Sequence, residues 1–270
     1  MPTQAPSRQS SRWLSSNRIQ PRTNEREAAV ATTQELEAYL ADAHIAPEVF
    51  DLRPDYRALL LAVDGIEPGA SDIRSETLLL KAESHAAASL AAQAVEDLPH
   101  IAAWREAYRA FGAKPQRTRN SLEALTRRAE SGLPRVNRLT DIYNAISVIH
   151  QIPLGGEDLQ KYRGAPHLTR SEGTEAFDTV AAGETILEHP DAGEVIWGDD
   201  EGVTCRRWNW RQGRRTALTD DTHTALFILD ALEPMTDGAL TAAADDLEDA
   251  LSHLGPNITL ARRLLANNSK

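Results

Sequence analysis

The segment CRRWNWRQGRR, residues 205–215, brings guanidinium groups, indole rings and an amide together in a short stretch. We expect a strand over 204–210, in which alternate side chains face opposite sides of a sheet. One face would carry Arg206, Trp208 and Trp210, and the other would carry Arg207, Asn209 and Arg211. The second face could bind a phosphate or carboxylate, and the tryptophans could stack on a base. Alternatively, the tryptophans pack in the core and the arginines pair with nearby acids.

A second polar set lies in LPRVNRLTDIYNAISVIHQIPLGGEDL, residues 133–159. Asn137, Asp141 and Asn144 follow spacings of four and three, so they share one face of a predicted helix. Polar groups on an otherwise apolar helix either line a pocket or hold adjacent backbone, and the sequence favours neither use.

Two glycines and an acid come after this helix. Gly155 and Gly156 would let the backbone approach a ligand closely, but a tight turn with a helix cap explains them equally well. Glu157 follows directly and could hold an ammonium group or act as a base.

Several well-known functional motifs are missing from the chain. The sequence has no GxxxxGK[ST] phosphate loop, GxGxxG fingerprint, GxSxG elbow or HExxH motif. Cys205 is its one cysteine, and the scattered histidines have no partner at metal-ligand spacing. We therefore expect neither a cofactor nor a metal, and the core of an ATP-using ligase does not fit.

The charge is unevenly distributed. The net charge of −11 argues against a simple nucleic-acid binder. Residues 101–215, however, hold seventeen of the 29 Lys and Arg, so phosphate contacts are expected there. No apolar run reaches the roughly 18 residues of a membrane helix, and the N-terminus does not have the pattern of a secretory signal. We expect a cytoplasmic protein with no membrane partner.

The elements that would position these residues follow an α+β pattern. Helices are expected from Thr33, over 77–98 with Pro99 as the break, over 102–111, 122–131 and 139–150, and as a peripheral cover near 240–254. Strands are expected over 58–63, 167–170, 194–197, 204–210 and 225–229. The helices would precede most of a mixed or antiparallel sheet. Residues 1–28 are predicted to be a disordered Arg/Ser-rich arm, and 29–270 a single domain.

The chain from about Trp104 to Pro234 resembles a known family. The similarity rests on WREAYRAFGAKP, SLEALTRR, the 133–159 segment, GEVIWGDDEG, RRWNWRQ and TDDTHTALFILDAL. These motifs are similar to the B3/B4 editing domain of the bacterial phenylalanyl-tRNA synthetase beta subunit, in its free-standing form. The resemblance implies a B3/B4-like fold with a pocket between two subdomains. It also implies hydrolysis of mischarged aminoacyl-tRNA by water, without a protein nucleophile.

The resemblance also suggests particular residues. The synthetase motif VDxTNYV corresponds to Thr140–Ile146, where Asp141 and Asn144 match and Tyr143 replaces the threonine. The motif QPxHAFD corresponds to Ile152–Asp158, where Gly155 replaces the histidine. The glycine-glycine-glutamate turn falls near Gln212-Gly213-Arg214, without the glutamate. Tyrosine specificity therefore does not carry over.

These observations lead to two main hypotheses. The first is a trans-acting hydrolase of mischarged aminoacyl-tRNA, and the second a non-catalytic protein that binds RNA or an amino-acid-like ligand; a protein-interaction module is a weaker third. The expected catalytic residues are Asn144, Asn209 and Glu157. The expected substrate-binding residues are Asp141, Tyr143, Gly155, Gly156, Arg207, Arg211 and Trp210.

Overall fold

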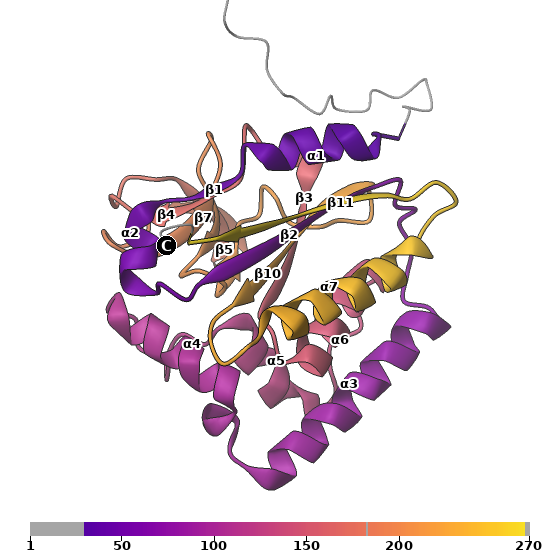
Figure 1. Cartoon of the computed structure of the whole chain (residues 1–270), viewed down its shortest axis with the longest axis horizontal. Helices are drawn as coiled ribbons and strands as arrows, with labels where there is room; N and C mark the ends of the chain where they lie inside the picture. Colours follow the sequence, from indigo (N-terminus) through magenta and orange to yellow (C-terminus); the bar gives the residue numbers. More distant parts are fainter. Residues whose placement is uncertain (1–29, 182, 268–270) are drawn as a thin grey trace, which may run out of the picture.

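The computed structural model describes residues 30–181 and 183–267, and its architecture is α+β. Helices pack against antiparallel and mixed β-sheets, as the sequence predicts (Figure 1). The arm predicted over 1–28 lies outside the described residues. No helix in the described part of the chain is both long and apolar enough to cross a membrane.

A four-stranded antiparallel sheet forms the centre of the fold, in the order β11-β2-β10-β3. Its two middle strands, β2 (Arg57–Asp64) and β10 (Thr224–Ala231), are buried on both faces. Both therefore read as nearly continuous apolar runs, and both were predicted. The outer strands are β3 (Leu154–Asp158) and β11 (Thr259–Ala266). Most helices precede most strands, as expected, although β2 and β11, from opposite ends of the described chain, join the same sheet.

Helices α6 (Arg138–His150) and α7 (Asp237–Ser252) cover one face of this sheet, and α3 (Ile73–Ala92) packs against α6 (Figure 1). Sheet residues such as Leu59, Leu61 and Phe227 pack there with the apolar sides of α6 and α7. The C-terminal cover helix expected near 240–254 corresponds to α7.

The opposite face packs against a five-stranded sheet in the order β1-β4-β7-β8-β9. Its strands are β1 (His44–Ile45), β4 (His167–Arg170), β7 (Val195–Gly198), β8 (Val203–Arg206) and β9 (Arg211–Gln212). Buried aromatic rings fill the space between the two sheets, with the Trp208 ring 5.0 Å from that of Tyr56 and 5.3 Å from that of Trp104. Trp104 comes from α4 (Pro99–Ala110).

The remaining elements lie around this core. They are α1 (Thr33–Ala41), α2 (Pro47–Leu52), η1 (Val95–Asp97), α5 (Ser121–Ala129), η2 (Leu159–Lys161) and the hairpin of β5 (Phe177–Ala181) and β6 (Glu184–Glu188). Capping residues fix several boundaries. Asn120 caps α5 by accepting from the backbone N–H of Glu123, and Asp72 caps α3 by accepting from Arg74 and Ser75.

Proline begins two of the helices, although Pro99 was expected only to end the helix before it. Pro99 is the first residue of α4, and Pro47 is the first residue of α2. Proline suits this position because the first helical N–H has no partner within the helix. The preceding helix α3 ends earlier, at Ala92.

Two local predictions around the polar motifs are wrong. β8 ends at Arg206, and Arg207 (φ 48°) and Trp208 (φ 67°) adopt the left-handed conformation, so the chain turns before β9. The predicted alternation of faces over 204–210 therefore does not occur. The Gly155-Gly156 pair is not a turn either, because both glycines lie inside β3.

Candidate functional site

A cavity of about 260 Å³ opens beside β3, the edge strand of the four-stranded sheet. Strands β3 and β10 form its floor, helices α5 and α6 form one wall, and the turn over 207–210 forms another. This volume is many times the roughly 10–15 Å³ that a single water needs on the same measure. The cavity therefore fits an amino-acid-sized group.

Glu157 projects from β3 into the cavity, and it is only 1% exposed. Burial raises the pKa of Glu157 to about 7, because a carboxylate loses its hydration there. The Tyr162 hydroxyl donates to its Oε2 over 2.5 Å and partly offsets this effect. Glu157 is therefore close to half ionised at neutral pH.

Asp230, on β10, is a second buried carboxyl in the cavity, and sequence reasoning missed it. Burial raises the pKa of Asp230 to about 7, against the effect of hydrogen bonds from the Tyr56 hydroxyl (2.5 Å) and the Asn209 amide (3.2 Å). Glu157 pairs with Leu226, four residues from Asp230 along β10. Strand geometry thus separates the two Cα atoms by roughly 14 Å, so the carboxyls occupy different parts of the cavity.

Two asparagines expected to act in catalysis also line the cavity, and they differ in their bonding. Asn209 accepts from the Tyr108 hydroxyl (2.9 Å) and donates to Asp230, so it is fixed in place. Asn144, from α6, makes no side-chain hydrogen bond to any described residue, although it is only 8% exposed. Its amide is free to bind a ligand in the cavity.

The charged side chains that line the cavity are all acidic. Glu157 and Asp230 are the charged residues among the described lining, which contains no Lys, Arg or His. Around them are apolar and aromatic side chains, including Tyr143, Trp197 and Trp208. Such a surface attracts a positively charged group and repels an anion.

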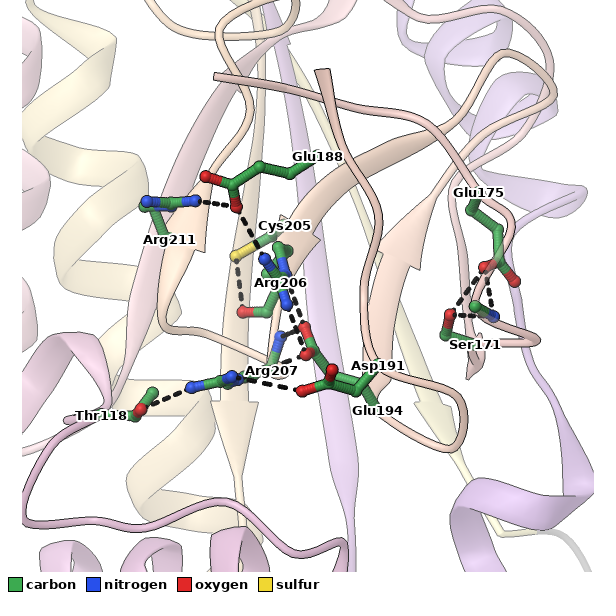
Figure 2. Close-up of polar contacts among 11 residues, drawn as sticks. Thr118, Ser171, Glu175, Glu188, Asp191, Glu194, Cys205, Arg206, Arg207 and Arg211 are labelled. Carbon is green, nitrogen blue, oxygen red and sulfur yellow. Dashed lines mark hydrogen bonds and ion pairs between the residues drawn. The ribbon is translucent and has the colours of Figure 1, made fainter. Parts of the chain in front are cut away.

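Arg206, Arg207 and Arg211 do not line the cavity but surround the ring of Trp210, which does. We call these arginines and their acidic partners the rim, and Figure 2 shows their polar contacts. Arg206 is buried and forms two hydrogen bonds to Glu194, from Nε (2.9 Å) and Nη2 (2.8 Å). Arg207 contacts Glu194 and the Thr118 hydroxyl, and Arg211 donates to Glu188 over 2.6 Å. The arginines thus pair with nearby acids, as the alternative interpretation expected.

Trp210 links this rim to the cavity. Its ring lines the cavity and lies 4.6 Å from the guanidinium carbon of Arg207 and 4.9 Å from that of Arg211. Trp208 also borders the cavity, but its ring is fully buried and packs against Tyr56 and Trp104 in the aromatic core. The two indole rings therefore share the cavity lining but differ in their other contacts: Trp208 contacts the aromatic core and Trp210 contacts the arginines.

Three other predicted residues lie on or near β3 and α6. Gly155 faces the cavity, whereas a Cβ on Gly156 would lie 2.8 Å from the Phe227 ring on the opposite side of the sheet. Asp141 is buried away from the cavity and accepts from the Ser71 hydroxyl (2.5 Å) and the Val136 N–H (2.8 Å). Asp141 therefore holds the backbone before α6 instead of lining the pocket.

The family model of the B3/4 domain matches residues 103–244, just over half of the chain. The chain belongs to the B3/4 domain family. Every residue that lines the cavity falls within the matched range. The cavity is thus built entirely from the B3/4 domain.

One solved structure with similarity to the chain is an N-terminal fragment of the phenylalanyl-tRNA synthetase beta subunit from Pyrococcus horikoshii. Its sequence identity is 12% and its TM-score is 0.42, and the match covers 81% of this chain. The chain spans about half the length of that fragment, since 50% of the fragment is covered. No curated protein matches the chain.

The B3/4 domain brings most of the predicted site residues together. The predicted residues that line the cavity are Tyr143, Asn144, Gly155, Glu157, Asn209 and Trp210. The predicted residues outside its lining are Asp141, Gly156, Arg207 and Arg211. Asp230 carried a signal that we did not use, because a carboxylate interrupts the apolar run ALFILDAL.

Proposed function

We propose that this B3/4 domain protein hydrolyses the ester bond of aminoacyl-tRNA, acting in trans in the cytoplasm. The observation that carries the proposal is Glu157, a buried carboxyl that faces the cavity with a pKa of about 7. A general base works best when its pKa lies near the operating pH. An ordinary surface glutamate would be too weak a base for this task.

Hydrolysis requires an aligned water and a stabilised oxyanion. Glu157 accepts a proton from the water as its oxygen bonds to the ester carbon, and the amide of Asn144 donates to the carbonyl oxygen as negative charge develops there. The ester C–O bond then breaks, and the ribose oxygen takes the proton from Glu157. Asn209, fixed between Tyr108 and Asp230, supports the opposite side of the substrate.

The charges of the cavity indicate the aminoacyl group that it would accept. Glu157 and Asp230 are both acidic, and no basic side chain in the described lining neutralises them. The α-ammonium group of an aminoacyl ester would pair with one of these two carboxylates. Asp230 would favour a side chain with a positive charge or a hydrogen-bond donor, and Trp210 at the rim would stack on the terminal base.

A second candidate is binding of an amino-acid-like ligand without catalysis. It is favoured by the rim, where Arg207 and Arg211 already have acidic partners, and by the net charge of −11. Both features weaken attraction to RNA. A salt titration separates the candidates, because contacts with tRNA phosphates make affinity fall steeply with salt.

The direct test is a deacylation screen with tRNAs that carry different amino acids, with tyrosine and basic residues among the mischarged species. We expect fast hydrolysis of at least one species, and slower hydrolysis of it by Asn144→Ala. Loss of ester at only the uncatalysed rate across the panel, with the protein folded, would reject the hydrolase and favour the binding candidate.

A further inference from the structure

The rim holds two kinds of arginine ion pair, which differ in geometry and in exposure to solvent. Arg206 and Glu194 form a pair through two nitrogens and two oxygens, and their side chains are 8% and 2% exposed. This paired geometry is the strong form of an arginine–carboxylate contact. Arg211 and Glu188 are 35% and 30% exposed, and a single donor, Nη2, joins them.

One oxygen of Glu188 lies between two guanidinium groups, where an oxygen of a phosphate could also bind. Its Oε2 accepts from Arg211 Nη2 over 2.6 Å and from Arg206 Nη1 over 2.8 Å (Figure 2). Two guanidinium groups around one oxygen is a typical arrangement for binding phosphate. The Nε of Arg211 is buried and has no hydrogen-bond partner among the described residues. The pair with Glu188 therefore leaves one donor of this guanidinium without an acceptor.

Arg211 does not depend on Glu188 for its position. Its guanidinium carbon lies 4.9 Å from the Trp210 ring centroid and 5.2 Å from that of Phe177, so it contacts both rings. Phe177 is fully buried, and Arg206 keeps Glu194 as its partner. Removal of the Glu188 carboxylate would leave both cations in place with one acceptor missing.

We propose that Glu188 is an internal competitor for the phosphate-binding position at the cavity rim. Its carboxylate occupies the site while the cavity is empty, and a phosphate of the substrate's terminal nucleotides displaces it into solvent. The exchange gives the acidic protein weak binding to nucleic acid in general, while a substrate whose aminoacyl group also fills the cavity binds well. This inference rests on the proposed function for the identity of the ligand.

The test measures binding of deacylated tRNA and of adenosine 5′-monophosphate to the full chain. Glu188→Gln should raise the affinity for tRNA by about two- to five-fold, the range of a partly exposed ion pair. It should also steepen the log–log salt slope by about 0.7, for one more phosphate contact with a single strand. Glu188→Asp, which retracts the charge by one methylene, should show a smaller gain.

Matched variants localise the effect. Glu184→Gln makes the same charge change at the exposed start of β6 and should leave the affinity unchanged. Glu188→Gln combined with Arg211→Gln should lose the gain, because Arg211 is the cation that Glu188 releases. Unchanged or weaker binding by both folded Glu188 variants would overturn the inference.

The two proposals fail in different ways. A gain in binding by Glu188→Gln without any ester hydrolysis would reject the hydrolase and retain the competitor. Hydrolysis without such a gain would retain the hydrolase and reject the competitor.

Discussion

The cavity and its rim bury acids equally well but give them different partners. Glu157 and Asp230 in the cavity are 1% and 2% exposed, and Glu194 at the rim is 2% exposed. The cavity acids have hydroxyl and amide partners, and burial raises the pKa of each to about 7. Glu194 instead has two hydrogen bonds from the Arg206 guanidinium. At equal depth, the Glu194 carboxylate is therefore held by a cation, whereas the cavity acids have no cationic partner and are available to a ligand.

The same carboxyl-to-amide substitution should have opposite effects on stability in the two regions, and the larger effect is expected at the rim. Glu194→Gln removes the charge that compensates buried Arg206, and it should lower the free energy of unfolding by about 3 kcal/mol. Urea denaturation measures this change. A loss below about 1 kcal/mol would show that the Arg206–Glu194 pair contributes little to the stability of the folded chain.

In the cavity, Glu157→Gln should stabilise the protein above neutral pH. The folded state holds the Glu157 proton up to pH about 7, whereas the unfolded chain releases it near 4.5, so the stability of the wild type falls as pH rises through this window. At about 1.4 kcal/mol per pKa unit, the variant should gain at most about 3 kcal/mol at pH 8 and little at pH 4.

Thermal denaturation from pH 4 to 8 checks this prediction. The exposed Glu172→Gln serves as the control and should leave the pH dependence unchanged. A Glu157→Gln variant with the same pH dependence as the wild type would mean that Glu157 does not titrate in this window.

The two glycines of β3 lie on opposite sides of the strand, one facing the cavity and one facing the core, so alanine substitutions at the two positions should differ in their cost. A Cβ on Gly156 would lie 2.8 Å from Phe227 and 3.0 Å from Leu218, so Gly156→Ala should cost about 1–3 kcal/mol through overpacking. A Cβ on Gly155 would approach the Gln212 amide alone, at 3.3 Å, so Gly155→Ala should change stability little and narrow the cavity. Equal losses in urea denaturation would contradict this orientation.

The smallest expected effect is at the exposed end of the rim. Arg211→Gln breaks a pair in which both side chains are about one-third exposed, so it should cost less than about 1 kcal/mol. A loss as large as that of Glu194→Gln would remove the contrast between the two rim pairs, and the same denaturation series decides it.

The fold was readable from the sequence where local pattern and burial agree. The apolar runs of β2 and β10 indicate strands buried on both faces, and the helix expected over 122–131 corresponds to α5. The turn at Arg207 and Trp208 was not readable, because left-handed backbone is uncommon for such residues and only long-range packing imposes it. Gly156 looked like a turn residue, but a glycine is needed there because the Phe227 ring leaves no room for a Cβ. Phe227 lies far along the chain, so the sequence did not show this contact.

The candidate site divides in the same way. Asn144 was predicted from its helix face and from the family motif, and Glu157 from its chemistry; both line the cavity. Asp230 was missed because its partners, Tyr56 and Asn209, lie 174 and 21 residues away. Arg207 and Arg211 were expected to be free for a ligand, but acids from the 188–194 segment reach them only in the folded chain.

The most direct test of the central claim is the pH dependence of deacylation under single-turnover conditions, after subtraction of the uncatalysed rate. For the substrate found in the screen, the wild-type rate should rise with pH and level off above about 7, as Glu157 loses its proton. Glu157→Gln should be at least about 100-fold slower, the usual scale of a lost general base, and should lack this rise. A folded Glu157→Gln that keeps the wild-type rate and pH profile would show that Glu157 is not the base.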